Sequence, residues 1–314
     1  MMSNQLQVRR PLNAPIWVHA LALGGFAMVT LVWIIAYYTY RETDVWAVWL
    51  NSDGPSRWPN GTETHFNERI FPASIFRTPS NTFSNLGYVF VGLYVLAYSL
   101  WDFRRPTAPT DPYAIRTPWL IAFFGFYCVG LGFGSGFMHA SLTGIGGWWD
   151  VYFMFGSLVA MIALHWGRII PEISLGTFRF PTWPLLIAIA IPVSYVVKES
   201  HGRFSDIQIM TGLIGTIISS FLVDFVLRQR RIQHRWHILS ILAFFLAFGI
   251  WNLTNANRFT SHEAMIQGHA IWHVLTACSL GFMAILYRTE VPVASAESED
   301  GVVGGMVPSA ARID

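Results

Sequence analysis

The sequence contains few charged residues. Only 12% of its 314 residues are Asp, Glu, Lys or Arg, whereas about 25% is usual in soluble domains. The formal net charge is +2, and no basic stripe or nucleic-acid-binding motif is present, so the sequence gives no support for DNA or RNA binding. The shortage of charge excludes an ordinary soluble protein and leaves a membrane protein as the class to consider.

Cysteine is also scarce. The chain has two cysteines, Cys128 and Cys278, and both fall inside apolar runs. A disulfide requires two cysteines with Cα atoms within about 7 Å of each other, which a sequence cannot show. Two buried cysteines of this kind carry no information on the redox compartment.

Long apolar runs are abundant. Hydrophobic residues make up 53% of the chain, and a bilayer-spanning helix needs about 20 such residues in succession. Tryptophans gather at the ends of these runs, as expected at membrane interfaces. The sequence therefore predicts an all-α, polytopic membrane protein, a seven-transmembrane-helix bundle with one additional N-terminal transmembrane helix. The expected spans are 17–38, 82–101, 119–139, 148–166, 182–198, 207–228, 236–253 and 268–287.

The spans divide the chain into five parts. We expect a polar N-terminus (1–16), an N-terminal anchor helix (17–38), an extracytoplasmic loop (39–81), a seven-helix domain (82–287) and a disordered C-terminal tail (288–314). The apolar run of the first span is about 20 residues, longer than the 7–15 of a signal peptide, so it is predicted to be retained. The tail is small, acidic and glycine-rich, a composition typical of disorder.

Arginine and lysine in the short loops predict the orientation in the membrane. Loops on the side of the N-terminus hold nine such residues and the opposite short loops hold three, and cytoplasmic loops carry the excess. Both termini are therefore expected in the cytoplasm. The nine are Arg104, Arg105, Arg116, Arg168, Arg179, Arg228, Arg230, Arg231 and Arg235, and the three are Lys198, Arg203 and Arg258.

Five polar residues lie at the ends of apolar spans in a pattern that suits metal chemistry. They are Ser135, His139, Asp150, His269 and His273. Residues four apart lie on one helix face, so Ser135 projects with His139, and His269 with His273. Three imidazoles form the ligand set of a catalytic zinc with an open position for water. Asp150 is a candidate general base and Ser135 a candidate donor to an oxyanion.

Each of these residues also has a simpler interpretation. A single intramembrane histidine such as His139 can be a hydrogen-bonded packing residue. The pair His269 and His273 can form a polar seam without a metal. Asp150 opens a helix, where an acid favours the positive end of the dipole, and Ser135 can bond to its own backbone. The combination of all five favours the metal site, which would lie toward the extracytoplasmic or lumenal side.

The residues also resemble a known family. The Ser135, His139 and Asp150 spacing, NTFSN at 81–85, WNLTN at 251–255 and GHAIWHVLT at 268–276 are similar to the alkaline ceramidases, part of a wider group of seven-helix membrane hydrolases that includes the adiponectin receptors. The resemblance covers about residues 63–287. It implies that the three histidines hold zinc, that Ser135 and Asp150 act around the zinc-bound water, and that the enzyme cleaves the amide of ceramide.

The chain departs from the family pattern in two places. It has an additional N-terminal helix, and its stretch ETHFNERIF differs from the acidic cluster through which the eukaryotic members bind calcium. Glu63, Asn67 and Glu68 are candidate calcium ligands, but Thr78 replaces a glutamate that the family places three residues before its asparagine. A solvated loop is the alternative interpretation of Glu63 and Glu68.

These observations predict a zinc-dependent membrane amidohydrolase that cleaves ceramide or a related N-acyl lipid to a fatty acid and a sphingoid base or amine. The expected partner is the membrane lipid substrate. The sequence indicates no nucleic-acid partner, and no protein partner can be inferred from it. The main alternative is a seven-helix receptor or sensor with a structural zinc and little hydrolysis. A metal or proton transporter ranks last, because its ionisable groups would lie at several depths.

Overall fold

A computed structural model of the chain describes residues 12–53, 64–108, 110–227, 230–231, 234–256 and 258–292. Among them are eight helices long and apolar enough to cross a membrane, which confirms the all-α polytopic fold with one helix ahead of a seven-helix unit. The spanning elements are α1 (Ile16–Tyr40), α3 (Pro79–Ser84) with α4 (Leu86–Asp102) as one span, α6 (Pro118–Ser141), α7 (Gly144–Ile169), α8 (Trp183–Ser200), α9 (Asp206–Leu227), α10 (His234–Asn255) and α11 (Gly268–Thr289).

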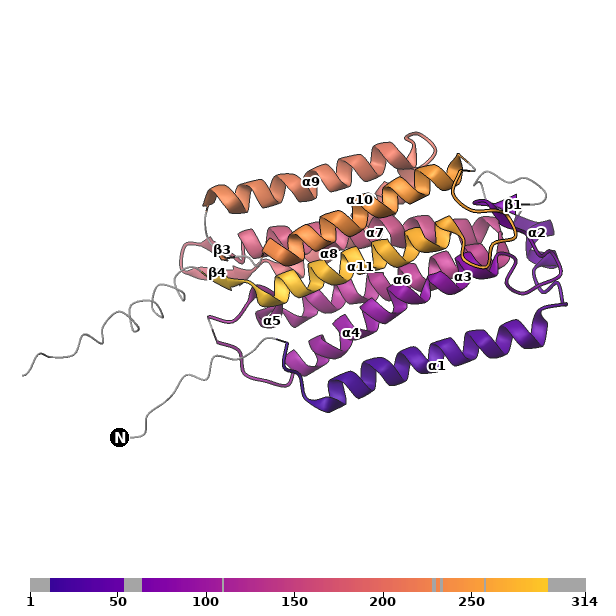
Figure 1. Cartoon of the computed structure of the whole chain (residues 1–314). Coiled ribbons are helices and arrows are strands. Elements are labelled where there is room, and N and C mark those ends of the chain that lie inside the picture. Colours follow the sequence, from indigo (N-terminus) through magenta and orange to yellow (C-terminus); the bar gives the residue numbers. More distant parts are fainter. Residues whose placement is uncertain are drawn as a thin grey trace, which may run out of the picture.

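The spanning helices run side by side, with α1 along one flank of the bundle and α9 along the other (Figure 1). The core lies between α4, α6, α7 and α11. In its most apolar stretch, α6 has 61% of its residues buried inside the protein, compared with 18% for α9 and 11% for α1. The helices with little burial present aliphatic and aromatic side chains outward, as lipid-facing helices do. The fully buried apolar side chains include Phe124, Tyr127, Phe155, Leu164, Leu286 and Tyr287.

Helices α6 and α7 are joined by a tight turn that the sequence specifies. Helix α6 begins with Pro118 in its first turn, a position where the missing N–H costs nothing. It ends at Leu142, which adopts a left-handed conformation (φ 53°). Thr143 then caps α7 by accepting the N–H of Gly146. The turn reverses the chain within two residues and brings the end of α6 against the start of α7.

Short elements close the two ends of the bundle. Helix α2 (Ala47–Asp53) and the hairpin of β1 (Thr64–His65) and β2 (Glu68–Arg69) lie at one end (Figure 1). Helix α5 (Tyr113–Arg116) and the hairpin of β3 (Glu172–Leu175) and β4 (Phe178–Pro181) lie at the other. There is also a two-residue ribbon of β5 (Arg230–Arg231) and β6 (Val291–Pro292).

The structure adds to the expected domain boundaries. The segment 39–81, expected as a loop, contains α2, the β1–β2 hairpin and the start of α3. The segment 288–314, expected as a tail, begins inside α11 and continues into β6. The reason is tertiary: Arg288 pairs with Asp102 and Glu290 with Arg168, all of them buried, so the helix extends beyond its last apolar residue. Residues 1–11, Glu63 and residues 293–314 lie outside the described residues.

Candidate metal centre

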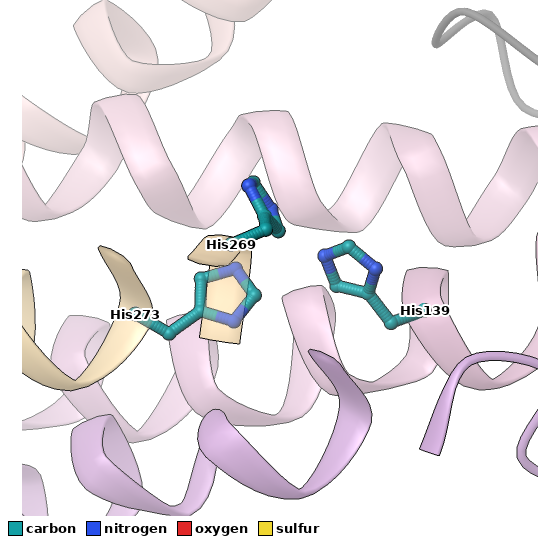
Figure 2. A group of neighbouring side chains, drawn as sticks. All are labelled: His139, His269 and His273. Carbon is teal, nitrogen blue, oxygen red and sulfur yellow. The ribbon is translucent and has the colours of Figure 1, made fainter. Parts of the chain in front are cut away.

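Three histidines from two distant helices meet at the end of the bundle that carries α2 and the β1–β2 hairpin. His139 lies in the last turn of α6, and His269 and His273 lie in the first turns of α11. The ring centroid of His139 is 5.0 Å from that of His269 and 5.0 Å from that of His273, and the last two are 4.4 Å apart. One nitrogen from each ring lies within 4.8 Å of the others. Figure 2 shows the three rings grouped around one point.

The three rings have nitrogens that the protein does not satisfy. All three histidines are buried. Among the described residues, neither ring nitrogen of His139 nor the Nδ1 of His269 has a hydrogen-bond partner. Leaving a buried polar group unpaired costs about 1–3 kcal/mol. A zinc ion takes two or three such imidazole nitrogens together with an open position, so the residues present fit a catalytic zinc.

His273 is held in one orientation by α3. The hydroxyl of Ser84 lies 2.7 Å from the Nδ1 of His273 and donates to the carbonyl of Asn81 at 2.8 Å. The backbone of Asn81 lies close to the same ring. Metal-binding histidines usually have their second nitrogen engaged in this way, which fixes the ring and its tautomer. The Nε2 of His273 is left for a metal.

The backbone of His139 is fixed by the segment that precedes α3. Thr78 is fully buried, and both its backbone N–H (3.2 Å) and its hydroxyl (2.7 Å) donate to the carbonyl of His139. The neighbouring Arg77 N–H donates to the carbonyl of Ala140. The last carbonyls of a helix have no partner within the helix. The 77–78 segment satisfies two of them and holds the end of α6 in place.

Ser135 and Asp150 face each other across the contact of α6 and α7. Both are buried, and the Ser135 hydroxyl lies close to the Asp150 carboxyl. The helices approach closely here: a Cβ atom added to Gly134 would lie 2.9 Å from the carbonyl oxygen of Trp149. Ser135 stands one turn before His139 on α6. The structure thus places the predicted hydroxyl of α6 beside the predicted carboxyl of α7, and the hydroxyl lies one helical turn from His139.

The candidate calcium ligands differ in how far the protein satisfies them. Asn67 donates its side-chain amide to the carbonyl of Thr260 at 2.6 Å, whereas its Oδ1 has no hydrogen-bond partner among the described residues. Both carboxyl oxygens of Glu68 accept backbone N–H groups at the start of α3, from Ser80 at 2.7 Å and Asn81 at 2.8 Å. Burial raises the pKa of Glu68 to about 7, against the lowering effect of these two N–H groups. Calcium binding by Glu63, Asn67 and Glu68 therefore stays a prediction.

A fourth histidine, His65, lies beside the site, and sequence reasoning did not single it out. It is fully buried in the β1–β2 hairpin, with its ring centroid 5.5 Å from that of His139. Burial lowers the pKa of His65 to about 4, so the ring is neutral near pH 7. The sequence offers only a lone histidine in a polar loop, which carries no helical spacing and thus no signal of its partners.

Two comparisons with known proteins bear on the chain. Residues 76–301 match the family model described as Ceramidase. A comparison with curated proteins gives no match. The matched region includes all three histidines together with Ser135 and Asp150, and it spans well over half of the chain. The chain therefore belongs to the Ceramidase family.

Proposed function

We propose that the protein is a zinc-dependent membrane amidohydrolase that cleaves the amide bond of ceramide or a related N-acyl lipid. Membership in the Ceramidase family supports amide hydrolysis on ceramide. The observation that carries the zinc dependence is the buried cluster of His139, His269 and His273, whose ligand atoms lie within 4.8 Å of one another. Three imidazoles form the protein ligand set of a catalytic zinc, whereas structural zinc sites use four protein ligands.

The chemistry follows from the residues around the cluster. When bound, zinc supplies a Lewis acid for the amide carbonyl and lowers the pKa of a water to near 7. Asp150 accepts the proton of the attacking water and then delivers it to the leaving nitrogen. Ser135 donates its hydroxyl hydrogen to the oxygen on which negative charge develops. A carbon–oxygen bond forms, the carbon–nitrogen bond breaks, and the products are a fatty acid and a sphingoid base or amine.

An apolar groove beside the histidines suits a lipid chain. The groove has a volume of about 600 Å³ and is open to the outside of the bundle. Ser84, which holds His273, contributes to its wall, so the groove reaches the site. Most of the lining is aliphatic or aromatic, as for pockets that bind apolar ligands. Its lining comes from α1, the α3 region and α11, and includes Tyr37, Phe83, Ile266, Ile271, Val274 and Leu275.

We assign the site to the extracytoplasmic or lumenal side of the membrane. This assignment rests on the excess of Arg and Lys in the loops on the side of the N-terminus. The three histidines, Asp150 and the β1–β2 hairpin all lie at the opposite end of the helices from those loops. Both termini are then cytoplasmic.

The test is a hydrolysis assay on a panel of labelled N-acyl lipids that includes ceramide, with zinc content measured on the same purified samples. Wild type should release fatty acid and contain about one zinc per chain, and His269→Ala should lose both. Asp150→Asn should keep its zinc and lose about 10²–10⁴-fold in rate, the usual contribution of a general acid–base group. Active protein without metal would overturn zinc dependence. Zinc-loaded protein that cleaves no lipid in the panel would favour a receptor or sensor with a structural zinc.

A further inference from the structure

The β1–β2 hairpin is built to place two side chains against the metal centre. His65 pairs with Glu68 across the hairpin, and the two intervening residues, Phe66 and Asn67, have φ angles of 48° and 65°. Two positive φ values are the mark of the type I′ turn that suits a tight hairpin. Asparagine tolerates this conformation, but a bulky residue such as phenylalanine adopts it only where the surroundings hold it there. Such strain is common at functional sites.

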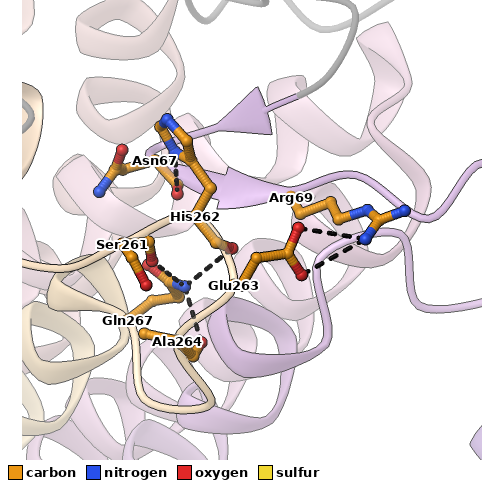
Figure 3. A network of polar contacts seen from close by, with 7 residues as sticks. All are labelled: Asn67, Arg69, Ser261, His262, Glu263, Ala264 and Gln267. Atoms are coloured by element: carbon orange, nitrogen blue, oxygen red, sulfur yellow. Dashed lines mark hydrogen bonds and ion pairs between the residues drawn. The ribbon is translucent and has the colours of Figure 1, made fainter.

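The hairpin is fixed on two sides. Glu68 holds the N–H groups at the start of α3. On the other side, the loop before α11 holds Asn67 and Arg69: the N–H of Arg69 donates to the carbonyl of His262, and the Nδ1 of His262 donates to the carbonyl of Asn67 at 2.9 Å. Figure 3 shows the bond of His262 to Asn67 together with the ion pair of Arg69 and Glu263 and the bonds of Gln267 to three loop carbonyls.

The turn of the hairpin packs directly on a metal-binding ring. The ring of Phe66 stacks on that of His269, with centroids 3.9 Å apart and planes 4° from parallel. The adjacent His65 then lies beside His139, with the two rings nearly perpendicular at 68°. Two consecutive residues of the hairpin therefore contact two different histidines of the cluster, one from α11 and one from α6.

His65 is buried and has unpaired ring nitrogens, as expected of a residue that bonds to a metal ligand. It is 0% exposed, and neither of its ring nitrogens has a partner among the described residues. Both ring nitrogens of His139 also lack a hydrogen-bond partner among the described residues. A metal can bind only one of the two nitrogens of His139. In Figure 2 one nitrogen of His139 is directed toward His269 and His273, and the other is directed away from them.

We infer that, when a metal is bound, the imidazole of His65 accepts a hydrogen bond from the ring nitrogen of His139 that the metal does not use, so that His65 is a positioning residue for the metal centre. No hydrogen bond joins the two rings in this structure, whose centroids lie 5.5 Å apart, and a rotation of the His65 ring would form it. The inference rests on the metal site of the proposed function. Ligand histidines regularly donate their second N–H to an acceptor that orients the ring and raises its basicity. Ser84 engages His273 in this way, and His65 is the buried group beside His139 that can do so from the hairpin.

The experiment measures zinc affinity in purified full-length protein by competition with a chelator. Three variants are compared with wild type: His65→Phe, which keeps the volume and removes both nitrogens, His65→Gln, which keeps an acceptor, and His165→Phe. His165 is a matched control because it is equally buried but lies near the opposite end of α7. The expected result is a loss of about 10- to 100-fold in zinc affinity for His65→Phe, recovery of most of it in His65→Gln, and wild-type affinity in His165→Phe.

Cobalt substitution supplies a second readout. The visible absorption bands of bound Co²⁺ report its coordination, and a positioning residue changes the affinity while leaving the set of bands in place. Unchanged zinc affinity in His65→Phe would overturn the inference, and so would an equal loss in the Phe and Gln variants, which indicates packing alone. A changed coordination spectrum in His65→Phe would also overturn it, because His65 would then be a ligand. Wild-type protein that binds no metal would instead overturn the proposed function.

Discussion

The two ends of the bundle bury polar groups in opposite ways. At the end that carries the β1–β2 hairpin, four buried histidines lie together and several of their ring nitrogens have no partner among the described residues. At the other end, buried charges are paired with each other. Arg288 makes a two-pronged contact with Asp102 at 2.6 and 3.1 Å, and Arg168 bonds to Glu290 at 2.7 Å.

The difference distinguishes a candidate ligand-binding site from a set of ion pairs that hold the helices together. Burial is similar at both ends, so burial alone does not mark a functional region. An ion pair whose members satisfy each other needs no ligand, and here such pairs tie the last turns of α4, α7 and α11 to one another. Imidazoles left without partners cost free energy unless a ligand completes them. A buried imidazole nitrogen without a partner in the described part of the chain also occurs at the paired end, at Nε2 of His165. The marker of function is therefore the cluster of such nitrogens around one point, as at His139 and His269.

The largest expected effect is on stability at the paired end. Asp102→Ala leaves Arg288 buried without its carboxylate, and removing one member of a buried ion pair costs about 3–5 kcal/mol. We expect a loss of this size in the free energy of unfolding, measured by denaturant titration in detergent micelles. Zinc affinity of the folded fraction should be unchanged, because the altered residue lies at the far end of α4 from the site.

Glu42→Ala is the control for this variant. Glu42 pairs with Arg41 at 3.2 Å, but both side chains are largely exposed, and an exposed pair contributes about 0–1 kcal/mol. A folded Asp102→Ala protein that had lost its zinc affinity would contradict the separation of the two ends. Equal stability changes in the two variants would contradict the proposal that the buried pair of Asp102 and Arg288 stabilises the bundle.

The sequence predicted those parts of the molecule that depend on periodicity. Long apolar runs gave the eight spans, and a spacing of four residues gave the pairs Ser135 with His139 and His269 with His273. The meeting of α6 with α11 followed from the requirement of one metal for several ligands, and the structure confirms that the three histidines come together. Helix geometry and ligand count are general rules, so they can be applied to an isolated sequence.

The remainder depends on contacts that no local rule encodes. The segment 39–81 has few apolar repeats, and the tight hairpin within it uses Phe66 and Asn67 where Asn-Gly or Asp-Gly is the usual signal. His65 consequently appeared as an ordinary loop residue. The roles of Ser84 and Thr78 also depend on where α3 lies against α6 and α11. Tertiary packing places these three residues, and periodicity does not.

The second prediction concerns Glu68, a buried carboxyl at the end of the bundle that carries the histidines. Unlike Asp102, it is held by backbone N–H groups and not by an arginine. Glu68 is 5% exposed and is held by backbone N–H groups; among the described residues it forms no ion pair. Its pKa is raised to about 7 from a reference of 4.5, chiefly by burial. The folded protein therefore retains a proton that the unfolded chain releases, so the stabilising contribution is present below pH 4.5 and is lost as pH rises to about 7.

Glu68→Gln should remove this pH dependence. We expect the difference in unfolding free energy between wild type and Glu68→Gln to shift by about 1–3 kcal/mol between pH 5 and pH 8, with wild type losing more as pH rises. Thermal unfolding of metal-free protein measures it, and taking the difference cancels the titration of the histidines. Glu263→Gln is the control, because Glu263 is an exposed carboxylate that pairs with Arg69. Parallel pH profiles for wild type and Glu68→Gln would refute the assignment.

The smallest effect is expected at Ser84. Removing its hydroxyl takes away the side chain that bonds to the Nδ1 of His273, while the backbone of Asn81 remains close to the ring. Because that polar backbone stays, Ser84→Ala should lose about tenfold in zinc affinity, the lower end of the range for a residue that orients a ligand. Ser99→Ala is the matched control: Ser99 is buried on the far part of α4, and its hydroxyl donates to the carbonyl of Val95. Chelator competition on both proteins should show a change in zinc affinity for Ser84→Ala alone. A comparable loss in both would mean that a buried hydroxyl matters here through helix packing, and the contrast between the two ends would then no longer hold for hydroxyl groups.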